Sequence, residues 1–449
     1  MRHSKLHQIS TPKTPNSELK TPNSKLRTFH SMNPTLNPIN LKKNYLIYLI
    51  ILTGLILRLI FPGDMEWKVD EKWMYEKAHL AVQNHELPEA GMQSGGGLVN
   101  PGLSLGVFAV IAAFTSNPLQ MNLVVQVVNI VAILCFLIFA LYKIDEKERS
   151  VWLWGIALAA VSPLAVLFSR KIWAQDLLPM FSFLIILGNY YRSKPWGAFV
   201  WGLFGALIGQ IHMSGFFFAA GLFLFSLTHD YYNHIKFRWY PWLLGSLLGS
   251  ITLLTWIHYM LLHPQFTRQS FLTIFQFNFF FYWFIDSQGL NIMYSMRQEF
   301  WQFLREPFVN GMPTYLVAAA HLFLLIVSGF TVVKLGTYFK KIFLFCKMRM
   351  PFRSLFTDLS TTKFYLYSIL LGLGVMMTLS ATAIQPHYLI CAFPFVYIFL
   401  AKILQHRRRL LIAIILVQLF LTLNFLFYVH KHNGVLDGDY GFTYSAQQK

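Results

Sequence analysis

The run NYLIYLIILTGLILRLIF, residues 44–61, decides the class of this protein. It is long enough to cross the hydrocarbon core of a bilayer as a helix, which takes about 20 mostly apolar residues. Similar runs recur along the chain, in which 55% of residues are hydrophobic and only 12% are charged, at a mean hydropathy of +0.47. This composition excludes an ordinary soluble globule and predicts an all-α polytopic membrane protein.

The residues before this run form a basic tail, 1–43, rich in Pro, Ser, Thr and Asn. Such a composition cannot bury a core, so we expect the tail to be disordered. No small-residue cleavage site follows residues 44–61, and we therefore interpret this run as a retained first crossing and not as a signal peptide. The tail then lies in the cytoplasm.

Further apolar runs predict about eleven crossings in all, some of them short. The run Pro101–Phe114 is too short for a span, and we expect a helix on or dipping into the outer surface. The predicted transmembrane module covers 44–429. Beyond the first run, its crossings lie at about 120–142, 151–168, 177–191, 197–212, 213–229, 239–262, 313–335, 363–384, 388–404 and 409–429.

The charges give this map an orientation. Of the 37 Lys and Arg residues, 26 fall in the basic tail or in loops on the same side as the tail, such as KIDEKERS and KILQHRRR, as the positive-inside rule expects. Most of the 19 Asp and Glu residues fall on the other side. The predicted external segments are the loops at about 62–119, 169–176 and 263–312 and a C-terminal tail at 430–449.

Two other protein classes are disfavoured by residue placement. The net charge of +18 comes from loop lysines and arginines, so we do not predict nucleic-acid binding. The three cysteines lie in apolar segments or a basic loop and show no disulfide or zinc spacing. The sequence shows no metal-ligand motif, and the use of a divalent metal as a cofactor stays open.

The acidic run FPGDMEWKVDEKWMYEKAHL, residues 61–80, follows directly on the first crossing and carries five carboxylates. The predicted membrane interiors are nearly free of acids, whereas a transporter more often places ionisable groups at mid-membrane. Charged chemistry collected at one interface favours an enzyme that works at the outer surface. A lipid-linked saccharide transporter or flippase and a non-catalytic membrane scaffold remain the alternatives.

Four stretches resemble the GT-C glycosyltransferases, in particular the protein mannosyltransferases (glycosyltransferase family 39) and the bacterial aminoarabinose transferases. The first is LRLIFPG followed by VDEKWMYEKA, which is similar to that family's first crossing and the acidic pair of its first external loop. The others are NPGLSLGVFAV, SPLAVLFSRKIWAQDLLPMFSFLIIL and QPHYLICAFPFVYIFLA. Where relatives commonly have a basic residue before Pro-Pro, this chain has Asn100.

The resemblance implies a GT-C type helical bundle with its active site at the outer leaflet. It implies transfer of a sugar from a polyprenyl-phosphate donor to a lipid, glycan or protein acceptor on the extracytoplasmic face. We accordingly expect an integral protein of a bacterial inner membrane, with the N-terminus in the cytoplasm and the C-terminus outside. The bilayer and the lipid-linked donor are its expected partners.

Catalysis is expected of the carboxylates. Asp70 is the predicted general base and Glu71 its partner in orienting the acceptor or tuning the pKa, while the resemblance adds Asp176. The bland alternative is a set of solvated acids on a loop helix, and for Asp176 a helix N-cap. Asp64 and Glu66 are expected to face water and to matter little.

The phosphate of a lipid-linked donor needs cations, because a guanidinium or an ammonium donates hydrogen bonds to phosphate oxygens. The candidates at the predicted outer interface are Arg58, Arg170 and Lys171, which are equally compatible with membrane anchoring. His212 and His387, the latter beside Tyr388, are external on this map and are further candidates for contact with phosphate or sugar. Structural hydrogen-bonded histidines are the alternative. The C-terminal tail is either a small lid over the cleft or a frayed end.

Overall fold

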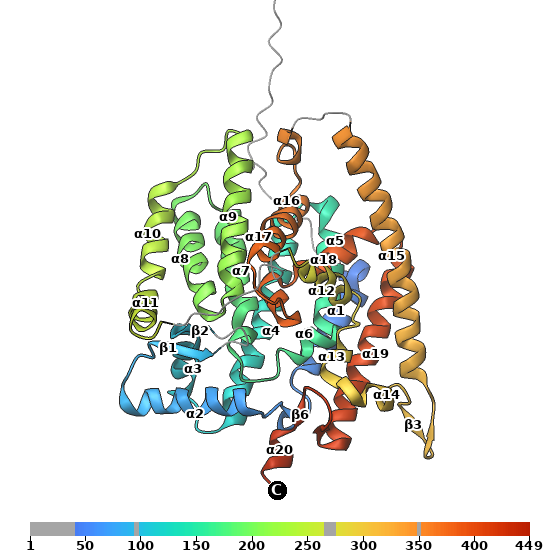
Figure 1. Ribbon diagram of the computed structural model, residues 1–449. Coiled ribbons are helices and arrows are strands. Elements are labelled where there is room, and N and C mark those ends of the chain that lie inside the picture. Colours follow the sequence, from blue (N-terminus) through green and yellow to red (C-terminus); the bar gives the residue numbers. More distant parts are fainter. Residues whose placement is uncertain (1–40, 94–97, 265–274, 348–351) are drawn as a thin grey trace, which may run out of the picture. The chain divides into compact units, whose positions relative to one another are not determined.

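Helices make up nearly all of the regular structure in the computed structural model of this protein, which describes residues 41–93, 98–264, 275–347 and 352–449 (Figure 1). All of these residues belong to the second of two units of the chain, Asn40–Lys449. The predicted all-α class is confirmed. The predicted disordered tail lies outside the described residues up to residue 40.

The helices follow the apolar runs, with short helices and two-stranded hairpins between them. The α-helices are α1 (Leu41–Leu57), α2 (Val69–Asn84), α3 (Leu103–Ala112), α4 (Pro118–Lys143), α5 (Glu146–Val161), α6 (Pro163–Leu167), α7 (Leu178–Tyr190), α8 (Pro195–Ile211), α9 (Ser214–Tyr232), α10 (Trp239–Gly249), α11 (Leu253–Leu262), α12 (Asn278–Ser287), α13 (Ile292–Met296), α14 (Phe300–Phe303), α15 (Leu316–Lys347), α16 (Thr361–Tyr367), α17 (Gly374–Leu379), α18 (Phe395–Ile403), α19 (Arg408–His432) and α20 (Tyr444–Gln447).

The remaining elements are short. The hairpins pair β1 (Ala90–Gln93) with β2 (Val99–Pro101), β3 (Phe308–Val309) with β4 (Met312–Pro313), and β5 (Gly434–Val435) with β6 (Gly441–Phe442), all antiparallel. The 3₁₀ helices are η1 (Pro62–Asp64), η2 (Ala174–Leu177), η4 (Arg297–Glu299), η5 (Phe352–Leu355) and η7 (Pro386–Ala392), and η6 (Ser368–Leu373) is a π-helix.

Among the described residues, four helical stretches are long and apolar enough to cross a membrane, or up to six if two bent pairs each count as one span. The four are Pro118–Lys143, Leu316–Gly336, Thr361–Leu379 and Arg408–His432. The bent pairs are α10 with α11, at 52°, and η7 with α18, at 84°. These features support a membrane protein.

Eleven crossings are not confirmed, because several of the predicted ones form short helices. α7 has 13 residues and α8 has 17, so at 1.5 Å per residue each falls short of a bilayer core of about 30 Å unless it extends into neighbouring segments. α3 has only 10 residues and packs against α2 and α8, in keeping with the surface helix that the sequence predicts there.

α5 forms the centre of the described unit. Every residue from Val151 to Val161 is buried, and the helix packs against α1, α4, α18 and α19. Two glycines permit this closeness: a Cβ at Gly54 of α1 would lie 2.4 Å from the carbonyl oxygen of Ala160, and one at Gly155 would lie 2.6 Å from Ile398. Small residues at helix contacts let backbones approach in this way, as is common in membrane bundles.

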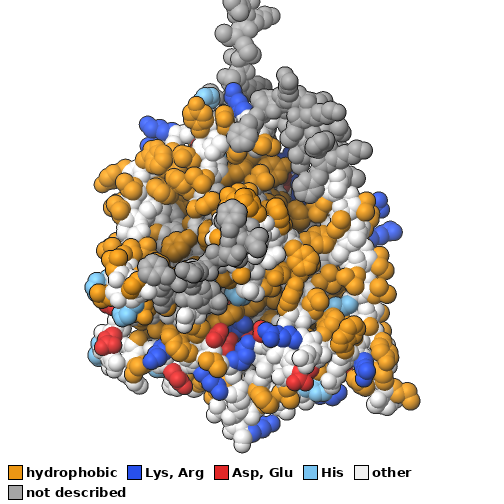
Figure 2. Space-filling model, viewed as in Figure 1, with side chains coloured by type: hydrophobic (Ala, Val, Ile, Leu, Met, Phe, Trp, Pro, Cys, Tyr) orange, Lys and Arg blue, Asp and Glu red, His pale blue; other side chains and the backbone are white. Residues whose placement is uncertain are grey.

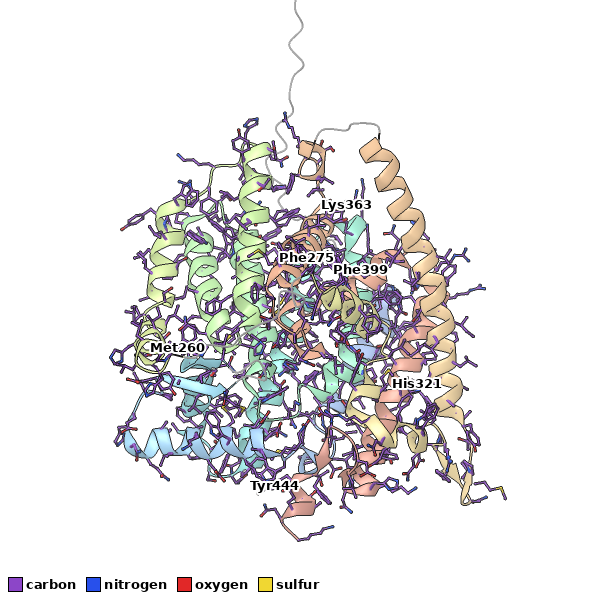
Figure 3. All side chains as sticks on the ribbon, viewed as in Figure 1. Met260, Phe275, His321, Lys363, Phe399 and Tyr444 are labelled. Carbon is purple, nitrogen blue, oxygen red and sulfur yellow. The ribbon has the colours of Figure 1, made fainter. Side chains whose placement is uncertain are left out.

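Segments that are far apart in sequence meet at one end of the bundle, which we call the α2 end (Figure 1). It carries α2, α13, α14 and the C-terminal strand β6, and the label of Tyr444 marks it in Figure 3. In Figure 2 a broad band of hydrophobic side chains separates mixed acidic and basic side chains at this end from Lys, Arg and His side chains at the opposite end. A band of this kind suits the apolar core of a bilayer.

The second large loop, predicted as external over about 263–312, contributes to the bundle. Its helix α12 packs against α17, α18 and η7. The ring of Trp283 is buried and lies 6.1 Å from that of Phe399, which Figure 3 labels on α18. Of the described residues of this loop, those from α13 to β4 lie at the α2 end (Figure 1).

Candidate functional site

Lys171 is the centre of a buried group of charges at the α2 end. Its ammonium lies 3.1 Å from a carboxylate oxygen of Glu66 and sits over the ring of Trp173 at 4.0 Å from the centroid. Burial works to lower the pKa of Lys171, but the charges of Glu66, Glu71 and Asp176 outweigh it and hold the pKa above its usual range. We call Glu66, Glu71, Lys171 and Asp176 the charged cluster.

Glu66 comes from the segment between η1 and α2. It is 3% exposed, and its two carboxylate oxygens approach Lys68 and Lys171 separately. Its backbone pairs with Thr443 beyond the C-terminal hairpin in an isolated antiparallel bridge. The expectation that Glu66 faces water is therefore wrong. The C-terminal segment covers Glu66, and the ammonium of Lys171 neutralises its carboxylate.

Glu71 lies in the first turn of α2 and is 1% exposed. Its Oε2 accepts a hydrogen bond of 3.0 Å from the backbone N–H of Lys68, so the side chain folds back over the helix start. Burial, and after it the negative charge of Glu66, raises the pKa of Glu71 to about 7. A carboxylate with this pKa exchanges a proton near neutral pH, as a general base must.

Asp176 reaches the cluster from η2, about a hundred residues along the chain from Glu71. It is fully buried, and neither side-chain oxygen has a hydrogen-bond partner among the described residues. Burial raises its pKa well above the usual range, against the opposing charge of Lys171. Asn129 of α4 donates to its backbone carbonyl at 2.7 Å and so fixes the segment. The alternative role of Asp176 as a helix N-cap is wrong, since its side chain accepts no hydrogen bond from a helix N-terminus.

Aromatic and histidine rings form a wall beside the cluster. His387 lies 5.0 Å from Trp173 and 5.7 Å from His212, and His212 lies 5.0 Å from Tyr388, measured between ring centroids. The ring nitrogen Nδ1 of His212 is 2.7 Å from the hydroxyl of Ser214, and burial lowers the pKa of His212 to about 4. His212 is therefore neutral at pH 7 and offers hydrogen bonding without charge.

The structure thus brings together six of the nine residues singled out in the sequence. They come from α2, the segment from Lys171 to η2, the α8–α9 junction and η7. They are Glu71, Lys171, Asp176, His212, His387 and Tyr388. Their side chains combine proton-accepting carboxylates, one cation and a wall of rings. This combination is suited to acid–base chemistry on a polar, ring-shaped substrate.

Arg58 and Arg170 do different work from the predicted contact with phosphate. Arg58 is 1% exposed and donates to the carbonyls of Gly54 and Ala160 at 2.7 and 2.6 Å. Arg170 is 2% exposed and donates to the carbonyls of Leu57 and Phe61 at 2.7 and 3.0 Å. Both guanidiniums donate hydrogen bonds to backbone carbonyls that have no helical partner at the C-terminal end of α1. This structural role differs from both the phosphate contact and the membrane anchoring considered from the sequence.

Asp70 stands apart from its neighbour Glu71. Its side chain is half-buried, and among the described residues it makes no hydrogen bond or ion pair. Asp64 is buried, and its carboxylate lies 2.7 Å from Nδ1 of His430. The expectation that Asp64 faces water is also wrong, because α19 ends directly over η1.

The C-terminal segment covers this site and is ordered. Tyr440 is buried and its hydroxyl donates to the carbonyl of Asp64, while the backbone N–H of Tyr444 donates to the carbonyl of Met65 at 3.0 Å. Of the two alternatives for this tail, the frayed end is therefore excluded. Sequence reasoning missed both Glu66 and Tyr440, since nothing in the spacing of five acids or of the late tyrosines distinguishes these two.

A metal centre finds no support in the described part of the chain, where no group of three or more His, Cys, Asp or Glu side chains is placed to hold an ion. The cluster's carboxylates surround a lysine, whose charge would repel a cation.

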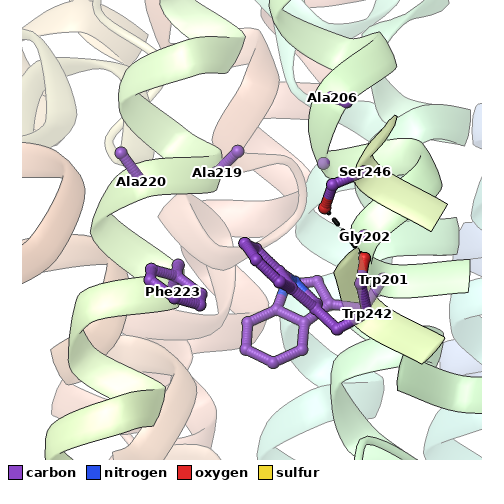
Figure 4. Close-up of a pocket in the computed structure, with 9 residues that line it drawn as sticks. Trp201, Gly202, Ala206, Ala219, Ala220, Phe223, Trp242 and Ser246 are labelled. Carbon is purple, nitrogen blue, oxygen red and sulfur yellow. Dashed lines mark hydrogen bonds between the residues drawn. The ribbon is translucent and has the colours of Figure 1, made fainter. Parts of the chain in front are cut away.

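A cavity of about 180 Å³ lies between α8, α9 and α10, away from the charged cluster (Figure 4). Its lining is aromatic or small, and the one hydroxyl, of Ser246, already donates to the carbonyl of Trp242 at 3.0 Å. Such a lining does not recognise a charged group. The lining residues are Trp201, Gly202, Gly205, Ala206, Ala219, Ala220, Phe223, Trp242 and Ser246.

Comparison of the chain with protein-family models, with curated proteins and with solved structures gave no match.

Proposed function

We propose that this protein is a membrane glycosyltransferase that moves a sugar from a polyprenyl-phosphate donor to an acceptor at the α2 end, which would face the extracytoplasmic side. One arrangement carries the proposal: the carboxylate of Glu71 is buried beside Lys171 and a wall of histidine and aromatic rings at one end of an apolar helical bundle, and burial raises the pKa of Glu71 to about 7. A lipid-linked sugar presents its reacting carbon at such an end, because its isoprenoid tail stays in the bilayer.

In the proposed reaction, Glu71 accepts the proton of the acceptor hydroxyl as that oxygen bonds to the anomeric carbon. The bond from the anomeric carbon to the phosphate oxygen breaks, and the lipid phosphate leaves with the electron pair. Lys171 offsets the negative charge in the cluster, while burial raises the pKa of Asp176 and so favours its protonated form, which donates a hydrogen bond. Half-buried Asp70, at the rim, would orient the acceptor.

Substrate would enter past the ring wall. The carboxyl groups of Glu66 and Glu71 are covered, whereas His387 and Tyr388 are half-buried and form the accessible side of the site. Rings stack on the apolar faces of sugars, and neutral imidazoles hydrogen-bond to their hydroxyls. The wall would therefore bind the sugar, and the cluster would do the proton chemistry.

The test is transfer of radiolabelled sugar from polyprenyl phosphate by purified variants at equal folded yield. Glu71→Gln should lower turnover about a hundredfold or more, because the amide cannot accept the proton. Glu76→Gln, an exposed position on the same helix, is the matched control and should match wild type. Near wild-type turnover of Glu71→Gln would remove the proposed base, and full loss in Asp70→Asn alone would move that role to Asp70.

A transporter of lipid-linked saccharide is the second candidate, supported by polar groups inside the bundle. Asp286 of α12 is buried and 3.3 Å from the hydroxyl of Tyr397, and both line a cavity of about 30 Å³ with Asn129. Acids inside a bundle are typical of transport pathways. If transport is the function, Asp286→Asn should stop movement of labelled lipid across vesicles, whereas a glycosyltransferase would keep its turnover in this variant.

A further inference from the structure

The C-terminal segment 434–449 covers the charged cluster at the outer tip of the α2 end, where Figure 1 shows β6 and α20. The backbone of Thr443 pairs with that of Glu66 in an antiparallel bridge, and Thr443 is fully buried. Burial raises the pKa of Tyr440, and the negative charges of Glu66 and Glu71 add to this rise, which places Tyr440 beside the cluster. We call residues 434–449 the C-terminal cover.

Packed helices surround the rest of the cluster. Glu71 belongs to α2, and Asp176 belongs to η2, which packs against α3, α4, α7 and η7. Glu71, Lys171 and Asp176 are 1%, 5% and 0% exposed, so a molecule dissolved in water cannot reach them in this arrangement. Access from the aqueous side therefore requires one covering element to move.

The C-terminal cover is the element best able to move, because little apolar surface fixes it. Val435 and Tyr440 are buried, but Leu436 and Phe442 are each 52% exposed. Hydrogen bonds to the segment 63–72 also hold the cover, and such bonds exchange with water at small net cost. They run from the N–H of Tyr444 to the carbonyl of Met65 at 3.0 Å, from the hydroxyl of Ser445 to the carbonyl of Gly63 at 2.9 Å, and from the amide of Gln447 to the carbonyl of Trp67 at 2.7 Å.

Exposed ion pairs hold the turn of the C-terminal hairpin. A terminal nitrogen of Arg297 lies 2.7 Å from Oδ1 of Asp439, and Nζ of Lys68 lies 3.9 Å from Oδ2. The side chains of Arg297 and Asp439 are 63% and 52% exposed, so water competes for both charges. Ion pairs of this kind contribute little to stability. They can therefore break and form again without a large cost in free energy.

Two residues at the end of α19 form a hinge between the bundle and the cover. α19 ends at His432, and the next two residues both have a positive φ, 57° at Asn433 and 135° at Gly434. A Cβ at Gly434 would lie 2.1 Å from the carbonyl oxygen of Gly441, so the closed hairpin requires glycine here. Residues at the end of an element commonly absorb the backbone rotation of a moving segment. Rotation at Asn433 and Gly434 would move the cover and leave α19 in place.

We propose that the C-terminal cover is a lid that rotates about Asn433 and Gly434 and, when open, admits the acceptor to the charged cluster from the aqueous side. The proposal rests on the proposed function for the identity of the admitted molecule. The donor enters past the ring wall, so the two substrates approach from different sides. While no acceptor is present, the closed lid keeps water away from Glu71 and so prevents transfer of the sugar to water.

The test fixes the lid with a disulfide in the full-length protein in neutral detergent. A Cβ at Gly63 would lie 3.2 Å from the Cβ of Ser445, so Gly63→Cys with Ser445→Cys should cross-link on oxidation after a small shift. Labelling of Glu71 by a water-soluble carbodiimide and an amine is followed by peptide mass spectrometry at pH 7. The oxidised double variant should label about tenfold or more slowly than after reduction, because labelling follows the open population. Each single variant, oxidised in the same way, is the matched control and should label at the wild-type rate.

A second variant weakens the closed state without a cross-link. Asp439→Asn should raise the labelling rate of Glu71 about two- to fivefold, since it removes exposed ion pairs that favour the closed lid. Asp437, in the same hairpin, bonds to Glu299 through its backbone N–H, and its side chain makes no ion pair with a described residue. Asp437→Asn is therefore the matched control and should leave the labelling rate unchanged.

Equal labelling of the oxidised and reduced double variant, with the cross-link verified by mass, overturns the lid, and so does failure of the two cysteines to cross-link. An unchanged labelling rate in Asp439→Asn contradicts the role of its ion pairs. Unchanged sugar transfer by the cross-linked protein would overturn entry of the acceptor beneath the lid. If labelling depends on the cross-link but no preparation transfers sugar, the lid stands and the glycosyltransferase proposal fails, so the two failures are distinguishable.

Discussion

Two buried ion clusters lie at opposite ends of the bundle and differ in how well their charges match. Near the end of α9, the carboxylate of Asp230 accepts two hydrogen bonds from Arg192, at 2.6 and 2.8 Å, and a third contact from His229 at 2.9 Å. Burial would raise the pKa of Asp230, but these partners outweigh it and hold the pKa below its usual value. In this cluster a single carboxylate, Asp230, is paired with a single guanidinium, Arg192.

The charged cluster at the α2 end is mismatched by comparison. Glu66, Glu71 and Asp176 share one fully buried cation, Lys171. The ammonium of the half-buried Lys68 pairs with Glu66, and Asp176 has no side-chain partner among the described residues. A folded protein can hold three acids so close only if they do not all ionise, so their protons stay exchangeable. A cluster in which every charge is paired stabilises one structure. A cluster with more acids than cations instead contains carboxyl groups that exchange protons, as acid–base catalysis requires.

The largest expected effect breaks the matched pair. Arg192→Gln should lower the free energy of unfolding by about 3–5 kcal/mol, because it leaves the Asp230 carboxylate buried without its guanidinium. Denaturant unfolding in detergent, compared with Lys194→Gln at an exposed neighbouring position, measures this loss. A loss no larger than that of the control would show that the pair is not a structural anchor.

The second prediction concerns pH and Glu71. Its pKa is raised from 4.5 to about 7 on folding, so between these values the folded state binds more protons than the unfolded state. Its contribution to the free energy of unfolding should therefore fall by about 3 kcal/mol as pH rises from 4 to 8. Glu71→Gln should remove this slope. An equal slope in the variant would place the titration elsewhere.

The third prediction sharpens the role of the shared cation. Lys171→Met should raise the pKa of Glu71, because it removes a positive charge that stabilises the carboxylate. The rising limb of turnover against pH, expected near pH 7 in wild type, should move up by about one pH unit. If the limb stays in place while turnover falls, Lys171 acts on the substrate and not on Glu71.

The smallest effect is expected at Asp176. Asp176→Asn should change the free energy of unfolding by less than about 1 kcal/mol, since the carboxyl makes no side-chain hydrogen bond among the described residues and burial disfavours its ionised form by raising its pKa. Asp230→Asn, at the matched cluster, provides the contrast and should cost several times more. Thermal unfolding of both variants measures the two losses of stability. Equal losses for Asp176→Asn and Asp230→Asn would contradict the distinction between the two clusters.

Apolar periodicity and charge placement predicted part of the site, because these are local properties. The helical class and the collection of carboxylates in the segment after the first apolar run follow from the sequence. The sequence did not predict which of the five acids of residues 61–80 lie in the buried cluster. Asp70 and Glu71 are adjacent, but a step of one residue turns a helix by about 100°, so one side chain faces the bundle and the other faces its rim.

The partners of the two arginines could not be predicted from the sequence either. An arginine at the predicted end of a crossing is equally compatible with a headgroup, a phosphate or a free carbonyl. The choice depends on the approach of α5 to α1, where Gly54 lets Ala160 come close enough for Arg58 to reach its carbonyl. Contacts between residues so far apart in the chain leave no trace in local spacing.

By itself, the sequence determined that this chain is helical, suited to a membrane, and acidic in its first large loop, because hydropathy and charge act residue by residue. Only the tertiary structure decided that Glu66 and Glu71 are buried with Lys171, that Arg58 and Arg170 hold backbone carbonyls, and that the C-terminal hairpin covers the cluster. The physical reason is desolvation: the pKa of a carboxylate and the partners of a cation depend on what packs around them, and those neighbours come from distant segments of the chain.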